Sequence, residues 1–303
     1  KLYPYQQVPA QSQAPVRHPV VIVGGGPIGL ALALDLGLKG TPALVLDDHE
    51  GAGLGSKAIC FAKRTLDIAH RLGAAQAMVD KGVVWNTGRV FHGAGQIFEF
   101  DLLPEDGHRN PAFINLQQPY FERYLVEAIE RAQAAGAPIE IRGANQVTGI
   151  DPQDGFSTVE VDTPDGPYRI EADYLIACDG ARSPLRDMMG LSFDGRVFED
   201  NFLIADVHMK ADFPTERWFW FEPPFEARGS PRCCTNSPTT SGGLISNWAG
   251  TSTARPNWTL PASAPVSMRC CPARPAPCRA MNWNGPRSIL SSVAACRNSG
   301  TAT

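Results

Sequence analysis

The chain has 303 residues, of which 43% are hydrophobic, and its formal net charge is −4. This length suffices for one large domain or two ordinary ones, and the mild acidity gives no global sign of nucleic-acid or membrane binding. No stretch approaches the roughly 20 apolar residues of a membrane span, and the polar residues 1–18 lack the apolar core of a signal peptide. We therefore expect a cytoplasmic protein with a disordered N-terminal tail over residues 1–18.

A glycine-rich turn joins the first predicted strand to the first predicted helix. Val20 to Val23 has the apolar pattern of a buried strand, Gly24-Gly25-Gly26-Pro27-Ile28-Gly29 follows, and Pro27 opens a helix that reaches about residue 39. In a G-x-G-x-x-G motif the first glycine permits the tight turn, the second lets a pyrophosphate approach, and the third lets the helix pack on the strand. The phosphates would bind at the helix N-terminus. The motif predicts a dinucleotide site that includes Gly24, Gly26, Pro27 and Gly29.

An acidic residue follows the second predicted strand, Ala43 to Leu46. Asp47 comes 18 residues after Gly29, and Asp48 is next to it. A carboxylate at this place can accept hydrogen bonds from ribose hydroxyls, and it disfavours a 2′-phosphate. The alternative is that Asp47 is a solvated loop acid. This fingerprint alone does not separate FAD from NAD.

The remaining elements alternate between helices and strands, which favours an α/β fold. We expect, in chain order, a loop at 51–56, a helix at 62–72, strands within 84–103, a helix at 119–135, a strand at 139–141, a hairpin of 156–161 and 168–172, and strands at 174–177, 202–209 and 217–221.

Four further segments carry a resemblance to a known family. They are Gly55 to Leu66 with Lys57 and Arg64, Asn115 to Pro119 with Gln118, Cys178 to Arg186 with Asp179-Gly180, and the aromatic run Arg217 to Phe225. Taken singly, each has an ordinary explanation as a surface charge, a helix start, a turn or a core strand. With the fingerprint, their order and spacing make residues 19–227 resemble the FAD-dependent aromatic-ring hydroxylases of the p-hydroxybenzoate and 3-(3-hydroxyphenyl)propionate hydroxylase type, which are class A flavoprotein monooxygenases.

The resemblance implies a domain plan and a set of cofactor contacts. It implies a Rossmann-like FAD-binding domain, a parallel sheet with helices, over 19–192, with 84–110 contributing to the substrate side, and the start of a mixed β-sheet substrate domain over 193–227. In the family, Gln118 would contact the ribityl chain, and Asp179-Gly180 would touch FAD. Lys57 stands where the family usually has Arg, so a bidentate contact is not expected there. The expected cofactor-binding residues are Gly24, Gly26, Pro27, Gly29, Asp47, Asp48, Lys57, Arg64, Gln118, Asp179 and Gly180.

The resemblance also implies the reaction. NADH or NADPH would reduce FAD as a transient co-substrate, and one atom of O2 would be transferred to a small phenolic substrate. No second dinucleotide fingerprint is present in the sequence, which suits a nicotinamide cofactor without its own domain. No spacing nominates any of the six His as the catalytic base, and no metal-ligand pattern stands out. The resemblance leaves a homodimer open.

The composition changes abruptly after Glu226. All 31 acidic residues, all six His and every Lys lie before residue 227, whereas eight Arg are the only charged residues after it. Six of the eight Cys fall in the same segment, without metal-ligand spacing. A disulfide or metal module, a basic linker and a shifted reading frame are three explanations.

The shifted frame is favoured, because the neighbouring frame permits a family-like sequence between Cys234 and Thr251. We therefore expect residues 228–303 to be an out-of-frame, disordered tail, with the second FAD motif of the family missing. Trp218, Phe219 and Trp220 would then be partly exposed, and the chain would be inactive or impaired as a hydroxylase.

Two other functions remain open from the sequence. One is an NAD-dependent Rossmann dehydrogenase, which would bind NADH and be colourless. The other is a non-catalytic FAD- or nucleotide-binding protein, which would bind the nucleotide without turnover.

Overall fold

The computed structural model describes residues 2–8, 14–51, 58–195, 201–208, 214–221, 232–237, 243–250 and 294–295. The chain divides into two compact units. The first comprises residues 1–81 and 116–196, and the second comprises residues 82–115 and 197–303. Within the described part of the chain, no helix is long and apolar enough to cross a membrane.

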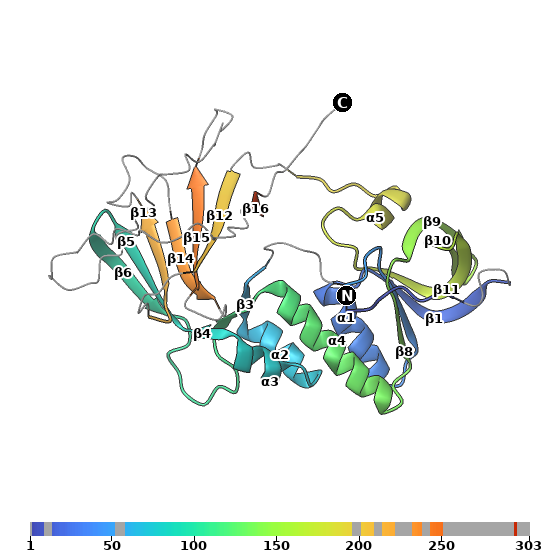
Figure 1. Cartoon of the computed structure of the whole chain (residues 1–303), viewed down its shortest axis with the longest axis horizontal. Coiled ribbons are helices and arrows are strands. Elements are labelled where there is room, and N and C mark those ends of the chain that lie inside the picture. Colours follow the sequence, from blue (N-terminus) through green and yellow to red (C-terminus); the bar gives the residue numbers. More distant parts are fainter. Residues whose placement is uncertain are drawn as a thin grey trace, which may run out of the picture. The chain divides into compact units, whose positions relative to one another are not determined.

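The first unit is built on a six-stranded sheet (Figure 1). The strands follow the order β8 (Ile139–Arg142), β2 (Ala43–Leu46), β1 (Val16–Val23), β11 (Tyr168–Ala177), β10 (Phe156–Asp162) and β9 (Gln146–Gln153). The first four are parallel, and β10 pairs antiparallel with both of its neighbours. Val23 pairs with both Leu46 and Ala177, so the carboxyl ends of β1, β2 and β11 meet at one edge.

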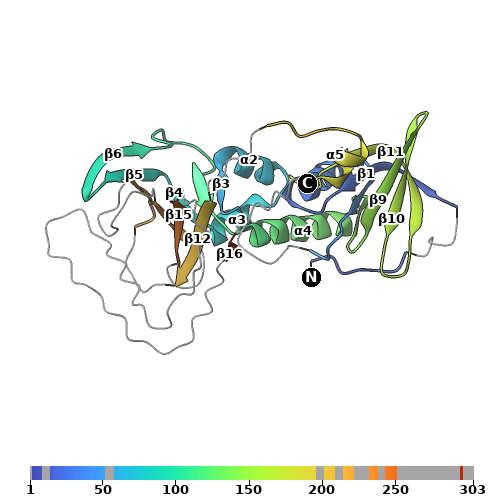
Figure 2. The same ribbon diagram turned by 90° about the horizontal axis from the view of Figure 1, so that it is seen from above.

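Helices cover this sheet and close its core. In Figure 1, α1 (Pro27–Leu38) runs alongside the longer α4 (Gln118–Ala134), which Figure 2 shows from above, and α1 also contacts β1, β2 and β8. Leu30 and Leu34 of α1 and Ile129 of α4 are fully buried. Burial of such side chains stabilises the fold by about 1.5–3 kcal/mol each. The shorter helices of this unit are α2 (Lys63–Arg71), α3 (Ala75–Lys81) and α5 (Pro184–Met188), and the short strand β3 spans Cys60–Ala62.

The second unit contains a seven-stranded mixed sheet. Its order is β16 (Ala294–Ala295), β12 (Asn201–His208), β15 (Gly243–Gly250), β14 (Arg232–Ser237), β13 (Arg217–Phe221), β5 (Thr87–His92) and β6 (Gly95–Asp101). β13 pairs parallel with β5, and the other pairs are antiparallel. The unit also holds β4 (Val83–Trp85), which pairs antiparallel with β7 (Phe113–Asn115).

Aromatic rings form the described core of this sheet. The Phe91 ring of β5 stacks on Trp220 of β13 at 5.0 Å between centroids and lies 5.3 Å from Trp218. Both tryptophans are 7% exposed. The expectation that Trp218 and Trp220 would be partly exposed is therefore wrong, because β5 and β14 flank β13 and Phe91 packs against both indoles. Phe219 is half-buried.

The predicted α/β architecture is confirmed, with differences at several elements. The two segments expected at 168–172 and 174–177 form one continuous strand, β11, and β1 begins at Val16. Residues 84–110, which we expected on the substrate side, lie in the second unit with β12 and β13. β14 and β15 continue the second sheet beyond residue 227. Most of the segment 228–303 lies outside the described residues, so its disorder and its shifted frame stay predictions.

Candidate cofactor site

The glycine-rich turn has the geometry that the fingerprint requires. Gly24 has φ +110°, a conformation that L side chains rarely adopt, and a Cβ there would collide with the carbonyl oxygen of Cys178. A Cβ at Gly29 would collide with the carbonyl oxygen of Gly24, so the helix packs tightly on the turn. A Cβ at Gly26 would instead meet nothing within 4 Å. Gly26 therefore faces open space, as the approach of a pyrophosphate requires.

The first turn of α1 suits an anion. Pro27 occupies its first position, no side chain caps the helix from Gly26, and no acidic residue lies in the first turn. The exposed N–H groups and the helix dipole favour negative charge at this end. These residues fit the diphosphate of a dinucleotide cofactor.

Asp47 lies beside this turn. Its Oδ2 accepts the Gly25 N–H at 2.5 Å, and its Oδ1 accepts the His49 N–H at 2.9 Å. Burial raises the pKa of Asp47, and the two backbone hydrogen bonds oppose that shift. The carboxylate thus organises the turn itself. The neighbouring Asp48 is exposed and contacts the His49 ring at 2.5 Å.

The end of β11 contributes the third part of the site. The Cys178 N–H donates to the Val23 carbonyl at 2.7 Å, which places Asp179 against Gly24. The Asp179 carboxylate accepts the Ser183 hydroxyl, with both oxygens at 2.7 Å, and the Leu185 N–H at 3.0 Å. Asp179 therefore holds the start of α5, while its backbone borders the fingerprint. Gly180 has φ +87° and turns the chain there.

The remaining predicted cofactor contacts are Gln118, Arg64 and Lys57. Gln118 is the first residue of α4, its Oε1 accepts the Ala58 N–H at 3.3 Å, and its Nε2 donates to Glu122 at 2.7 Å. Arg64 is exposed on α2. Lys57 lies outside the described residues. The structure thus brings the fingerprint, Asp47 and Asp179 together at the carboxyl edge of the sheet, and it ties Gln118 to the segment that follows Lys57.

Tyr3 belongs to this edge, although the polar composition of residues 1–18 predicts a disordered tail. Its side chain is 7% exposed, and its hydroxyl donates to the Gly25 carbonyl at 2.9 Å. The Leu2 N–H donates to the Glu50 carbonyl at 2.9 Å, just after β2. Nothing in the spacing of residues 1–18 indicated this contact, because it depends on glycines far along the chain.

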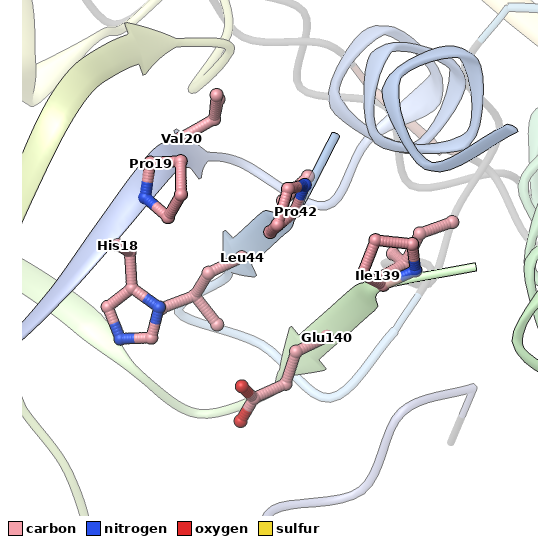
Figure 3. Close-up of a pocket in the computed structure, with 9 residues that line it drawn as sticks. His18, Pro19, Val20, Pro42, Leu44, Ile139 and Glu140 are labelled. Carbon is pink, nitrogen blue, oxygen red and sulfur yellow. The ribbon is translucent and has the colours of Figure 1, made fainter. Parts of the chain in front are cut away.

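A pocket of about 290 Å³ lies at the opposite edge of the same sheet. Figure 3 shows it beside the middle of β1 and at the amino ends of β2 and β8, with His18 and Glu140 as its polar side chains. Burial, followed by the charge of Arg142, lowers the pKa of His18. Cofactors bind at the carboxyl ends of parallel strands, so this pocket is separate from the candidate site.

Comparisons with known proteins agree with this geometry. The model of the FAD binding domain family matches residues 17–251. The chain is 30% identical over 191 residues to a para-nitrophenol 4-monooxygenase of Pseudomonas sp. (strain WBC-3). That match covers 62% of this chain and 46% of the relative. It is 31% identical over 205 residues to a probable NADH-specific resorcinol 4-hydroxylase of Rhodococcus jostii (strain RHA1). That match covers 64% of this chain and 37% of the relative.

A solved structure shows the same fold. The p-nitrophenol 4-monooxygenase of Pseudomonas putida DLL-E4 superposes with a TM-score of 0.69 at 24% identity, covering 80% of this chain and 60% of that one. The chain matches less than half of the length of the two curated relatives named above. The family model nevertheless spans more than half of the chain, and the chain therefore belongs to the FAD binding domain family.

Proposed function

We propose that this chain is the FAD-binding part of a monooxygenase that consumes NADH or NADPH and hydroxylates phenolic rings. The observation that carries the proposal is the open face of Gly26 at the uncapped N-terminus of α1, with Asp47 beside it. The names of the relatives support the substrate class, since they act on a nitrophenol and on resorcinol. A cytoplasmic location and a small phenolic substrate are parts of the same proposal.

Each group at the carboxyl edge has a task in this proposal. The α1 N-terminus binds the diphosphate, and Asp47 holds the turn and accepts from the ribose hydroxyls. Gln118 lies at the start of α4, where its amide would contact the ribityl chain. FAD, when bound, supplies the redox chemistry with O2.

The test begins with cofactor binding. Purified protein should be yellow or become yellow with FAD, and titration should quench flavin fluorescence. NADH and NADPH consumption should then be measured with 4-nitrophenol, resorcinol and hydroxyphenylpropionates, together with product mass and H2O2. A colourless protein that binds NADH tightly and ignores FAD would reject the proposal in favour of a dehydrogenase.

A non-catalytic FAD-binding protein is the second candidate. The composition of residues 227–303 favours it, because this segment contains no Asp, Glu, Lys or His. FAD binding without product formation, under conditions in which a related hydroxylase turns over, would support this candidate.

A further inference from the structure

The N-terminal arm, defined here as Leu2 to Val8, is held at the same edge as the fingerprint. Glu50 is its main anchor, because the Glu50 carbonyl accepts the Leu2 N–H and the Glu50 carboxylate accepts the Tyr5 N–H, both at 2.9 Å. The Tyr5 hydroxyl donates to Asp165 at 2.8 Å, at the turn between β10 and β11. The arm therefore spans from the end of β2 to that turn.

Three glycines form the seat of this arm. A Cβ at Gly51 would lie 2.7 Å from the Leu2 nitrogen, and a Cβ at Gly143 would collide with the Tyr3 carbonyl oxygen. A Cβ at Gly25 would lie 2.5 Å from the Tyr3 hydroxyl. The contacts at Gly51 and Gly143 are with backbone atoms and require glycine, whereas the Gly25 contact is with the end of the Tyr3 side chain, so the arm packs into a shaped surface.

Two adjacent peptide groups of the phosphate-binding turn are each held from one side. The peptide between Gly24 and Gly25 is held through its N–H, which donates to Asp47 at 2.5 Å. The peptide between Gly25 and Gly26 is held through its carbonyl, which accepts the Tyr3 hydroxyl at 2.9 Å. The described peptides are all trans, so the Gly26 N–H points opposite to the Gly25 carbonyl. Tyr3 thereby directs the Gly26 N–H away from the arm.

We propose that Tyr3 is a positioning residue for the cofactor, which orients the Gly25–Gly26 peptide so that the Gly26 N–H meets the pyrophosphate. The inference rests on the proposed function, because it needs the fingerprint to bind FAD. Burial, reinforced by the negative charge of Asp47, raises the pKa of Tyr3, so the phenol stays a donor throughout the physiological range. A turn held in its binding geometry before the ligand arrives loses less entropy on binding.

The test compares Tyr3→Phe with Tyr5→Phe in the full chain. Both remove one phenolic hydroxyl from the same arm, but the Tyr5 hydroxyl contacts Thr163 and Asp165 and not the fingerprint. Dissociation constants are measured for FAD by flavin fluorescence, and for ADP and adenosine by calorimetry. Tyr3→Phe should raise the dissociation constants for FAD and ADP by a common factor of about 3 to 10, as the loss of one neutral hydrogen bond predicts. Adenosine, which has no phosphate, should bind unchanged, and Tyr5→Phe should leave all three unchanged.

A second readout does not depend on affinity. In the protein without FAD, Tyr3→Phe should accelerate hydrogen exchange at the Gly25 amide, which donates to Asp47 in the same turn, whereas Tyr5→Phe should not. Far-ultraviolet circular dichroism checks that both variants fold. If Tyr3→Phe misfolds, Gly143→Ala displaces the arm by colliding with the Tyr3 carbonyl oxygen while the phenolic hydroxyl is retained, and it should weaken the binding of FAD and ADP in the same way.

The outcomes separate this inference from the proposed function. A wild-type protein that does not bind FAD overturns both. If the wild-type protein binds FAD and Tyr3→Phe binds FAD and ADP with the same dissociation constants, the inference alone is overturned. Tighter FAD binding by Tyr3→Phe would mean that the arm competes with the cofactor. Weaker adenosine binding by Tyr3→Phe would mean that Tyr3 lines the pocket for the base. Either result overturns the positioning role.

Discussion

Arg89 holds Glu216 with two hydrogen bonds, one from Nε to Oε2 at 2.7 Å and one from Nη2 to Oε1 at 3.1 Å. The Trp218 indole N–H donates to the same Oε2 at 2.7 Å. The hydrogen bond from Arg89 is the main cause of the lowered pKa of Glu216. Because β5 carries Arg89 and Glu216 precedes β13, this pair joins the two strands that meet in parallel in the second unit.

We predict that Glu216→Gln lowers the free energy of unfolding of the second unit at pH 7 by roughly 1–3 kcal/mol. A lowered folded pKa gives stability that is complete above the unfolded pKa of about 4.3 and is lost as the pH falls through the folded pKa. The difference between variant and wild type should therefore shrink below about pH 4. Urea unfolding followed by tryptophan fluorescence, at pH 7 and below about pH 4, measures this difference in the free energy of unfolding. Glu127→Gln, which breaks the exposed pair with Arg123, should change stability by less than about 0.5 kcal/mol.

Gly26→Ala should abolish or strongly weaken FAD binding without unfolding the protein. Gly26 has φ −79°, which alanine adopts freely, and the new methyl group would meet no protein atom within 4 Å. It would stand where the pyrophosphate approaches. Gly95→Ala is the matched control, since its Cβ would make only an ordinary contact, 3.7 Å from the His92 carbonyl. Equal FAD affinity in the two variants would remove Gly26 from the cofactor site.

Asp47→Ala should weaken the binding free energy of FAD by about 1.5–3 kcal/mol, the value of a hydrogen bond to a charged acceptor. The loss has two sources, because the variant lacks the ribose acceptor and also releases the Gly25 N–H. Flavin-fluorescence titration measures it. Asp151→Ala removes an exposed carboxylate on β9 and should leave the affinity unchanged. If Asp47→Ala binds FAD as tightly as wild type, the predicted ribose contact does not exist.

A one-base correction near the Glu226 codon should raise hydroxylase turnover. The neighbouring frame would supply acidic and histidine side chains that residues 227–303 lack. Product formation from 4-nitrophenol and resorcinol, and leakage of H2O2, should be compared between the two proteins. Sequencing of the coding DNA decides the premise directly. Comparable turnover by the uncorrected chain would show that residues 228–303 are a genuine part of the enzyme.

The local parts of the candidate cofactor site could be predicted from the sequence because they depend on short spacings. A strand, a turn with three spaced glycines, a helix opened by Pro27 and an acid after the next strand all lie within about 30 residues. Such a pattern has few other uses, and the structure places these residues at one edge. The longer β11 was missed as one element because Asp173, next to Tyr174, interrupts the apolar pattern within it.

The contacts of Tyr3 and the burial of Trp218 could not be predicted in this way. The seat of Tyr3 is made by Gly25 and Gly143, which are distant in sequence and carry no pattern that points to an aromatic partner. Trp218 is buried by strands on both sides of β13, including β14, whose composition gave no sign of a place in the sheet. Long-range pairing of this kind depends on burial in the whole sheet, and strand propensity carries little of it.

The split of the second unit along the sequence has a consequence for folding during synthesis. β5 ends at His92, and its parallel partner β13 begins at Arg217, 125 residues later. At a ribosomal rate of about 5–20 residues per second, the β5–β6 hairpin waits roughly 6–25 s for that strand. During this time one edge of β5 and the ring of Phe91 have no partner from β13, and an unpaired edge is a site for aggregation. The first unit has its last sheet strand at Ala177, so it can close its sheet while the second unit still waits for β13.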